Sequence, residues 1–126
     1  MLWEIEHLKD QNYVTVIIEG EFNLADNLKL LENIISVEYW QPGMNLLFDS
    51  RKIDLIKSDV DELREAGKNM AAFNNQLGSG KVAVLMATVY NFGKGRQFEM
   101  LAEKKISVGI KIFMDENQAL DWLAGH

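Results

Sequence analysis

The chain has 126 residues, no cysteine and a formal net charge of −6 at pH 7. A chain of this length forms a single domain, so we expect residues 1–126 to fold as one unit. The absence of cysteine excludes disulfides and thiolate metal sites, and the acidic balance argues against nucleic-acid binding, which needs a clustered basic surface.

The N-terminal region is predicted to form a β-hairpin. Polar and apolar side chains alternate over residues 2–8, and residues 13–19 are rich in β-branched side chains. On the second strand, Val14, Val16 and Ile18 are expected to share one face.

Strands and helices then alternate. A helix is predicted over residues 25–37, with an apolar stripe formed by Leu24, Leu28, Leu31 and Ile35. Three further strands are each followed by a helix: 44–49 by 59–77, 81–88 by 95–105, and 108–114 by a C-terminal helix that Asp115 caps. This alternation predicts an α/β domain with a mostly parallel sheet.

The segment 81–88 is apolar on both faces, which predicts a central strand covered on each side. Right-handed crossovers put the helices between successive parallel strands on the same side of the sheet. The second face therefore needs a reversal of the chain path, another segment of the chain or a partner subunit. The last alternative leads us to expect a homodimer.

Three segments carry a resemblance to a known family: Asn45-Leu-Leu-Phe-Asp49 before a polar loop, Lys81-Val-Ala-Val-Leu85 with Tyr90 and a basic stretch behind it, and residues 112–123. The chain resembles the STAS superfamily, and more closely its SpoIIAA-like (STAS/SEC14-like) branch of small free-standing bacterial proteins. The resemblance implies a single α/β domain with a mixed, mostly parallel five-stranded sheet, an N-terminal antiparallel hairpin and about four helices.

Ser58 is the one candidate modification site. In the anti-sigma factor antagonists of this superfamily, a serine near the start of the helix after the third strand is phosphorylated, and Ser58 occupies the matching place. No glycine or second serine accompanies it, and Asp59 and Asp61 would repel a phosphate. We therefore expect Ser58 to be the N-cap of the helix and the domain to lack the phosphoserine switch.

Two clusters could bind ions. Asp49, Asp54, Asp59 and Asp61 surround one loop and could hold magnesium, but we expect them to serve helix capping and solubility instead. Gly93-Lys94-Gly95-Arg96 is predicted to open the helix after the fourth strand, where a helix N-terminus and two cations could hold an anion.

An apolar pocket is a further alternative, because related SEC14-like folds hold lipids. The side chains considered for its lining are the tryptophans and four methionines, although residues at these spacings are usually core: Trp3, Trp40, Trp122, Met70, Met86, Met100 and Met114.

We therefore expect a non-enzymatic, cytoplasmic, regulatory protein-interaction domain without a cofactor, a metal or a membrane span. The interaction surface is placed at the carboxyl ends of the strands. Its predicted residues are Asp49, Ser50, Arg51, Asp54, Ser58, Asp59, Tyr90, Lys94 and Arg96. The alternative function is a carrier for a small apolar or anionic ligand, held between the sheet and the helices 59–77 and 95–105.

Overall fold

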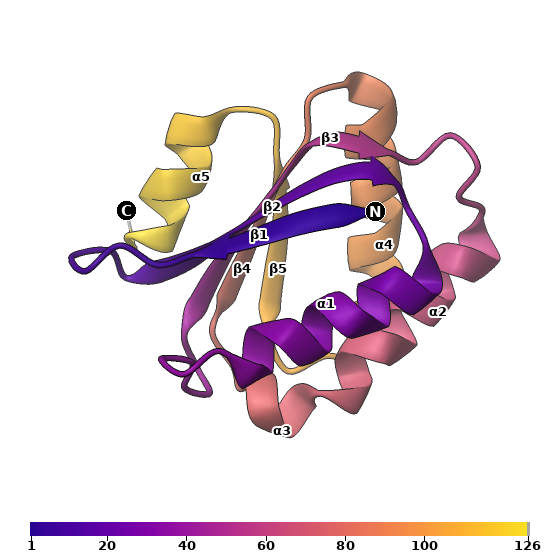
Figure 1. Ribbon diagram of the computed structural model, residues 1–126. Helices are drawn as coiled ribbons and strands as arrows, with labels where there is room; N and C mark the ends of the chain where they lie inside the picture. The colour runs from indigo at the N-terminus through magenta and orange to yellow at the C-terminus, as the bar shows by residue number, and fades with distance from the viewer. Residues whose placement is uncertain (126) are drawn as a thin grey trace.

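A five-stranded mixed sheet organises the chain, and the computed structural model describes residues 1–125 of it, so that His126 lies outside the described residues. The elements are, in chain order, β1 (Leu2–Glu6), β2 (Tyr13–Glu21), α1 (Leu24–Ser36), β3 (Asn45–Asp54), α2 (Val60–Ala72), α3 (Asn74–Leu77), β4 (Lys81–Leu85), α4 (Val89–Ala102), β5 (Gly109–Phe113) and α5 (Glu116–Leu123) (Figure 1). The strands lie in the order β1-β2-β3-β4-β5, with β1 antiparallel to β2 and the others parallel. The predicted fold class and N-terminal hairpin are confirmed.

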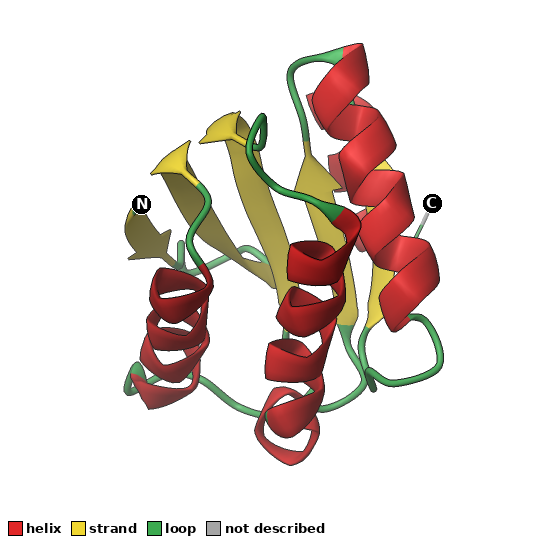
Figure 2. Cartoon of the chain, turned by 90° about the vertical axis from the view of Figure 1, so that its right-hand side faces the viewer, coloured by secondary structure: helices red, strands yellow, loops and turns green. Residues whose placement is uncertain are grey.

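Three helices cover one face of the sheet and one covers the other. Helices α1, α2 and α4 lie side by side on the first face (Figure 2), as right-handed crossovers require. On the second face, α5 packs against β4 and β5. The double burial of β4 therefore comes from this chain's own last helix. The reason for expecting a homodimer falls away, and the dimer stays a prediction.

The buried face of α1 differs from the predicted stripe. Leu30, Leu31 and Ile34 are buried, whereas Leu28 is 37% exposed. Both the predicted stripe through Leu28 and the observed stripe, in which Asn27 precedes Leu30, Leu31 and Ile34, have helical spacing. In the folded chain the observed stripe faces the sheet. It was missed in the sequence analysis because its first residue, Asn27, is polar.

Strand β3 is longer than predicted, and residues 50–54 belong to it rather than to a loop. The added length comes from the end of β2, which pairs Glu19 with Lys52 and Glu21 with Asp54 after a register shift. This pairing partner is distant in sequence, so local patterning does not reveal it. As a result, Ser50 and Arg51 point to opposite faces of a strand.

The start and the length of α2 differ from the prediction, whereas the cap of α5 does not. Asp59, not Ser58, caps α2, and its Oδ1 accepts from the Glu62 N–H at 2.8 Å. The predicted helix 59–77 breaks at Phe73 into α2 and α3. The cap of α5 is as predicted, since Asp115 Oδ1 accepts from the Gln118 N–H at 3.0 Å.

Helix α4 begins at Val89, well before the predicted residue 95, because the Thr88 hydroxyl caps it by accepting from the Asn91 N–H at 3.1 Å. Gly93, Lys94, Gly95 and Arg96 therefore lie within the helix. The predicted anion site at a helix N-terminus is wrong, because the free N–H groups that it needs belong to the earlier first turn.

Candidate functional site

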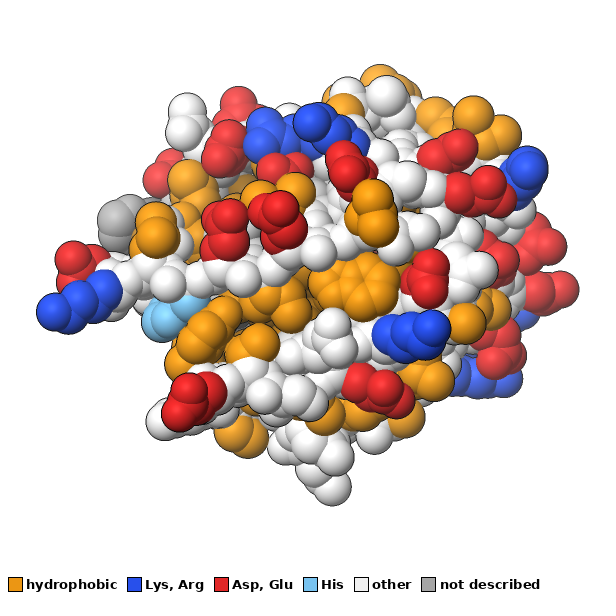
Figure 3. Space-filling view, viewed as in Figure 1, with side chains coloured by type: hydrophobic (Ala, Val, Ile, Leu, Met, Phe, Trp, Pro, Cys, Tyr) orange, Lys and Arg blue, Asp and Glu red, His pale blue; other side chains and the backbone are white. Residues whose placement is uncertain are grey.

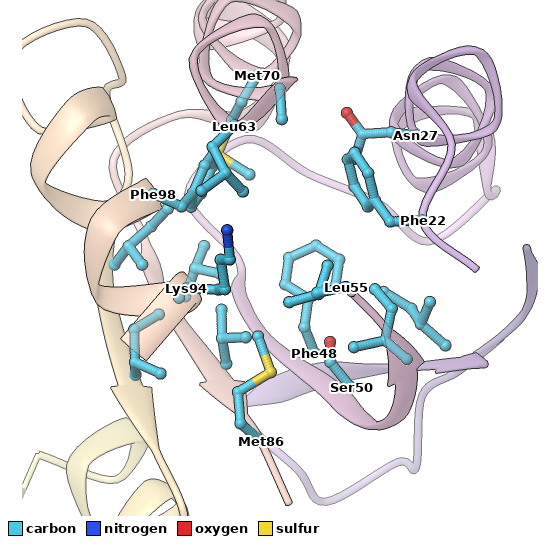
Figure 4. Close-up of a pocket in the computed structure, with 18 of the residues that line it drawn as sticks. Phe22, Asn27, Phe48, Ser50, Leu55, Leu63, Met70, Met86, Lys94 and Phe98 are labelled. Carbon is cyan, nitrogen blue, oxygen red and sulfur yellow. The ribbon is translucent and has the colours of Figure 1, made fainter. Parts of the chain in front are cut away.

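A cavity of about 110 Å³ lies between the sheet and helices α1, α2 and α4 (Figure 4). It opens among the carboxyl ends of three parallel strands, since Phe22, Leu55 and Met86 line it and each follows directly after β2, β3 or β4. The walls are mainly aliphatic and aromatic, with contributions from Phe48, Leu63, Met70, Phe98, Ile110 and Ile112. Three polar side chains share this lining: Asn27, Ser50 and Lys94.

Ser50 is placed in the cavity by strand alternation. It shares a face of β3 with Leu46 and Phe48, and the residue is only 3% exposed. Within residues 1–125, no hydrogen-bond partner is found for its hydroxyl, which Figure 4 shows beside the cavity. Asn27 differs in this respect, because its Oδ1 accepts from Asn69 Nδ2 at 3.3 Å. Among the described residues, the fully buried side-chain oxygen without a partner is Glu99 Oε1, so the Ser50 oxygen is instead open to the cavity, where a ligand could hydrogen-bond it.

Lys94 crosses from α4 towards the start of α2. Its Nζ donates to the carbonyl oxygen of Ser58 at 2.7 Å and lies 5.7 Å from the centre of the Tyr90 ring. Throughout the described part of the chain, no carboxylate lies within ion-pair distance of this ammonium group. The cavity wall therefore holds a half-buried positive charge without an acidic partner.

Ser58 is inside the protein. The residue is 4% exposed, and its Oγ donates to Glu62 Oε1 at 2.8 Å. A kinase would reach the hydroxyl only after the start of α2 had opened. Whether Ser58 is ever phosphorylated, the alternative that was set against N-capping in the sequence analysis, remains untested.

Asp49 and Arg51 lie on the opposite face of β3, beside α5. Arg51 Nε and Nη2 donate to the two carboxylate oxygens of Asp49 at 2.9 and 2.8 Å, and Arg51 also lies 3.5 Å from Glu116 Oε2. The hydrogen bonds from Arg51 hold the pKa of Asp49 below its ordinary value, and Asp49 raises the pKa of Arg51. This bidentate pair fixes the orientation of the Asp49 carboxylate, because both of its oxygens already accept hydrogen bonds from Arg51.

The remaining predicted residues are dispersed. Asp54 Oδ1 accepts from the Ile56 N–H, Asp59 caps α2, Tyr90 is 52% exposed in the first turn of α4, and Arg96 pairs with Glu99 at 3.3 Å. The predicted rim is therefore divided between two faces of the sheet. The four aspartates around the loop do not form a metal site, and in residues 1–125 no three histidine, aspartate or glutamate side chains are grouped for metal binding.

Of the side chains weighed as pocket lining, Met70 and Met86 line the cavity, and both also belong to the buried core. Trp3 instead donates to Asn33 of α1, in the strip between β1 and α1 where Figure 3 shows hydrophobic side chains among scattered acidic groups. Phe22, Leu55 and Phe98 were missed as lining residues. The alternation of Leu46, Phe48 and Ser50 is the signal that could have placed Ser50 on the same wall.

A shallow groove adjoins the cavity and shares Ile53 and Leu55 with it. Ile56 and Tyr90 line this groove, and Val89 is next to Tyr90 in the chain. These three side chains are 76%, 52% and 78% exposed, respectively.

No family model matches the sequence, and no curated protein matches it. The structure does match the crystal structure of an uncharacterised protein of the DUF3478 family with a SpoIIAA-like fold from Shewanella loihica PV-4. The TM-score is 0.60 with 19% sequence identity, and the match covers 97% of this chain and 92% of that one. The chain has a SpoIIAA-like fold. The resemblance inferred from the sequence is thus confirmed at the level of the fold. At 19% identity, the match does not assign a function to this chain.

The SpoIIAA-like fold of this chain has two features that bear on function. Its strands follow in sequence order, so the sheet has no point where the order reverses, which is where open α/β sheets usually bind ligands. The cavity instead lies within the layer between sheet and helices. In addition, no helix among residues 1–125 combines the length and apolar character needed to cross a membrane.

Proposed function

We propose that this SpoIIAA-like domain binds a small, mainly apolar ligand in the cavity between the sheet and α1, α2 and α4, as a carrier or a ligand-responsive module. The cavity itself carries the proposal. An engineered apolar cavity of about 150 Å³ in another protein binds benzene, so a cavity of about 110 Å³ suits a body of roughly four or five carbon atoms.

The polar groups around the cavity favour binding over catalysis. Activation of a serine nucleophile requires a neighbouring base, and Ser50 has no hydrogen-bond partner among the described residues. Lys94 is bonded to a backbone carbonyl rather than to a nucleophile. These groups are suited to orient a ligand, as the few polar side chains in ligand pockets do.

Native mass spectrometry tests the proposal with two matched variants of α2. Ala66 lines the cavity and is 6% exposed, so Ala66→Leu fills part of the space, whereas Ala72→Leu adds the same group on an exposed position. Protein purified from its native host should carry the mass of a bound small molecule, which Ala66→Leu loses and Ala72→Leu retains. Wild-type protein without added mass, and without amide shifts near the cavity in xenon-saturated solution, overturns the proposal.

The regulatory protein-interaction role predicted from the sequence is the second candidate, with the predicted homodimer as its contact. One observation supports it, the exposed Ile56, Val89 and Tyr90 beside the cavity mouth, because solvent-exposed apolar clusters favour association. Sedimentation tests it: a dimer that Ile56→Asp dissociates supports this contact, and a monomeric wild type at high concentration rules it out.

A further inference from the structure

We infer that the ligand of the cavity is a compact aliphatic carboxylate, that is, a short or branched hydrocarbon body with one carboxylate group. The inference rests on the proposed function and adds the chemical class of the ligand. It comes from two polar groups that the protein leaves incompletely paired at the wall of an apolar cavity.

The first group is the ammonium of Lys94. A half-buried charge loses hydration, and that loss is offset when the charge is paired. Among residues 1–125, five of the thirteen lysine and arginine side chains lie within 4.0 Å of a carboxylate oxygen. Of the eight unpaired ones, all are exposed except Lys81 and Lys94, and of these two Lys94 lines the cavity. The ammonium group has three N–H donors, and the protein supplies one acceptor, the Ser58 carbonyl oxygen at 2.7 Å. An anion in the cavity would supply the missing charge and a second acceptor.

The second group is the Ser50 hydroxyl. It lies on the β3 side of the cavity, whereas Lys94 comes from α4 and extends towards α2 (Figure 4). Since the residue is 3% exposed and its hydroxyl is without a partner in the described chain, the O–H is available to donate. A carboxylate has two oxygens and can accept from two donors, so one that reached both groups would pair the Ser50 hydroxyl and the Lys94 ammonium.

The apolar walls select among anions. A phosphate or sulfate group would bring further charged oxygens against Phe48, Leu63 and Phe98, where no donors meet them. Leaving such acceptors unpaired in an apolar site is unfavourable. A carboxylate needs fewer donors than a phosphate or sulfate, and its hydrocarbon body gains from contact with the aliphatic lining.

Isovalerate and its neutral isostere isovaleramide are suitable probes, because they share one branched body and differ in charge. We expect isovalerate to shift the backbone amide signals of Ser50, Lys94 and Gly95 in NMR titrations and to bind about tenfold more tightly than the amide, since charge-assisted hydrogen bonds are the stronger ones. Lys94→Met, which keeps the aliphatic stem, should abolish this preference, and Lys94→Arg should restore part of it.

Lys111→Met is the matched control. Lys111 also lies over an aromatic ring, with Nζ 5.4 Å from the centre of Phe113, but it is exposed and does not line the cavity. The Lys111→Met variant should bind isovalerate with the same affinity as the wild type. If this variant weakens binding as much as Lys94→Met, the effect is general surface charge and the inference is wrong.

The two proposals fail in different ways. If neither probe shifts the cavity amides, binding in the cavity itself is refuted. If both probes bind wild-type protein equally, the cavity binds ligands but the carboxylate class is refuted; this comparison needs no variant and so does not depend on how Lys94→Met folds.

Discussion

Gly95 of α4 lies so close to Ile112 of β5 that a Cβ added at Gly95 would be 3.0 Å from Ile112 Cγ2. Gly93, in the same helix, has no such neighbour within 4 Å. The two glycines, which were placed together at the start of one helix in the sequence analysis, therefore differ in role: Gly95 permits the close approach of α4 to the sheet beside the cavity.

The two glycines should respond differently to alanine. Gly93→Ala should stabilise the protein by about 0.5–1 kcal/mol, because alanine is the better helix former. Gly95→Ala gains the same propensity but crowds Ile112, and overpacking costs about 1–3 kcal/mol. Urea unfolding should place Gly95→Ala below Gly93→Ala in stability, and equal stabilisation by both would show that the contact is not tight.

The two buried serines form a second test. Ser58→Ala removes a hydroxyl that donates to Glu62, and we expect a loss of about 1–2 kcal/mol. Ser50→Ala removes a hydroxyl with no partner in the described chain, so stability should be unchanged or rise by up to about 1 kcal/mol. Thermal unfolding of ligand-free protein measures both, and an equal loss would mean that Ser50 is bonded in the folded state.

The start of α2 provides a third prediction. Asp59→Ala removes the N-cap and should cost about 1 kcal/mol. Asp61→Ala is the control, because its 88% exposed side chain pairs only with Arg64 on the surface, and such pairs contribute little. Chemical denaturation measures the free energy of unfolding of both variants. Equal stability of Asp59→Ala and Asp61→Ala would contradict the assigned cap.

The Asp49–Arg51 pair predicts a dependence on pH. Because Arg51 lowers the pKa of folded Asp49, the pair stabilises the protein above the ordinary aspartate pKa, and this stabilisation is lost as the pH falls through the lowered value. Arg51→Met should raise the pKa of Asp49 in a ¹³C NMR titration of the side-chain carboxyl. Its stability should approach that of the wild type in acid, and an unmoved Asp49 pKa would contradict the pairing.

Sequence patterns predicted the elements whose signals are local. The β-branched alternation through Val14 and Val16 and the cap at Asp115 depend on neighbouring residues alone, and the structure has both as expected. The strand–helix order likewise sufficed for the α/β class.

Prediction failed where a distant segment decides and where a local cap was missed. Ser50 was placed in a loop because the partner that prolongs its strand, the end of β2, is distant in sequence. Tertiary packing overrides such local preferences. Lys94 was placed at the N-terminus of a helix because the cap at Thr88, a local signal, was missed. Both errors concern residues that line the cavity. Its polar groups therefore became apparent only once β3, which carries Ser50, and α4, which carries Lys94, were seen to face the same space.

The simple strand order of the sheet also bears on how the chain acquires its structure. Only β1 and β2 are joined by a short turn, whereas each parallel pair must close a long crossover, as Tyr13 with Asn45 and Leu46 with Val82 show. Most contacts of the described chain are accordingly long-range, and closing such loops costs entropy before the contacts form. We therefore expect the hairpin to form quickly and the parallel part of the sheet to form more slowly.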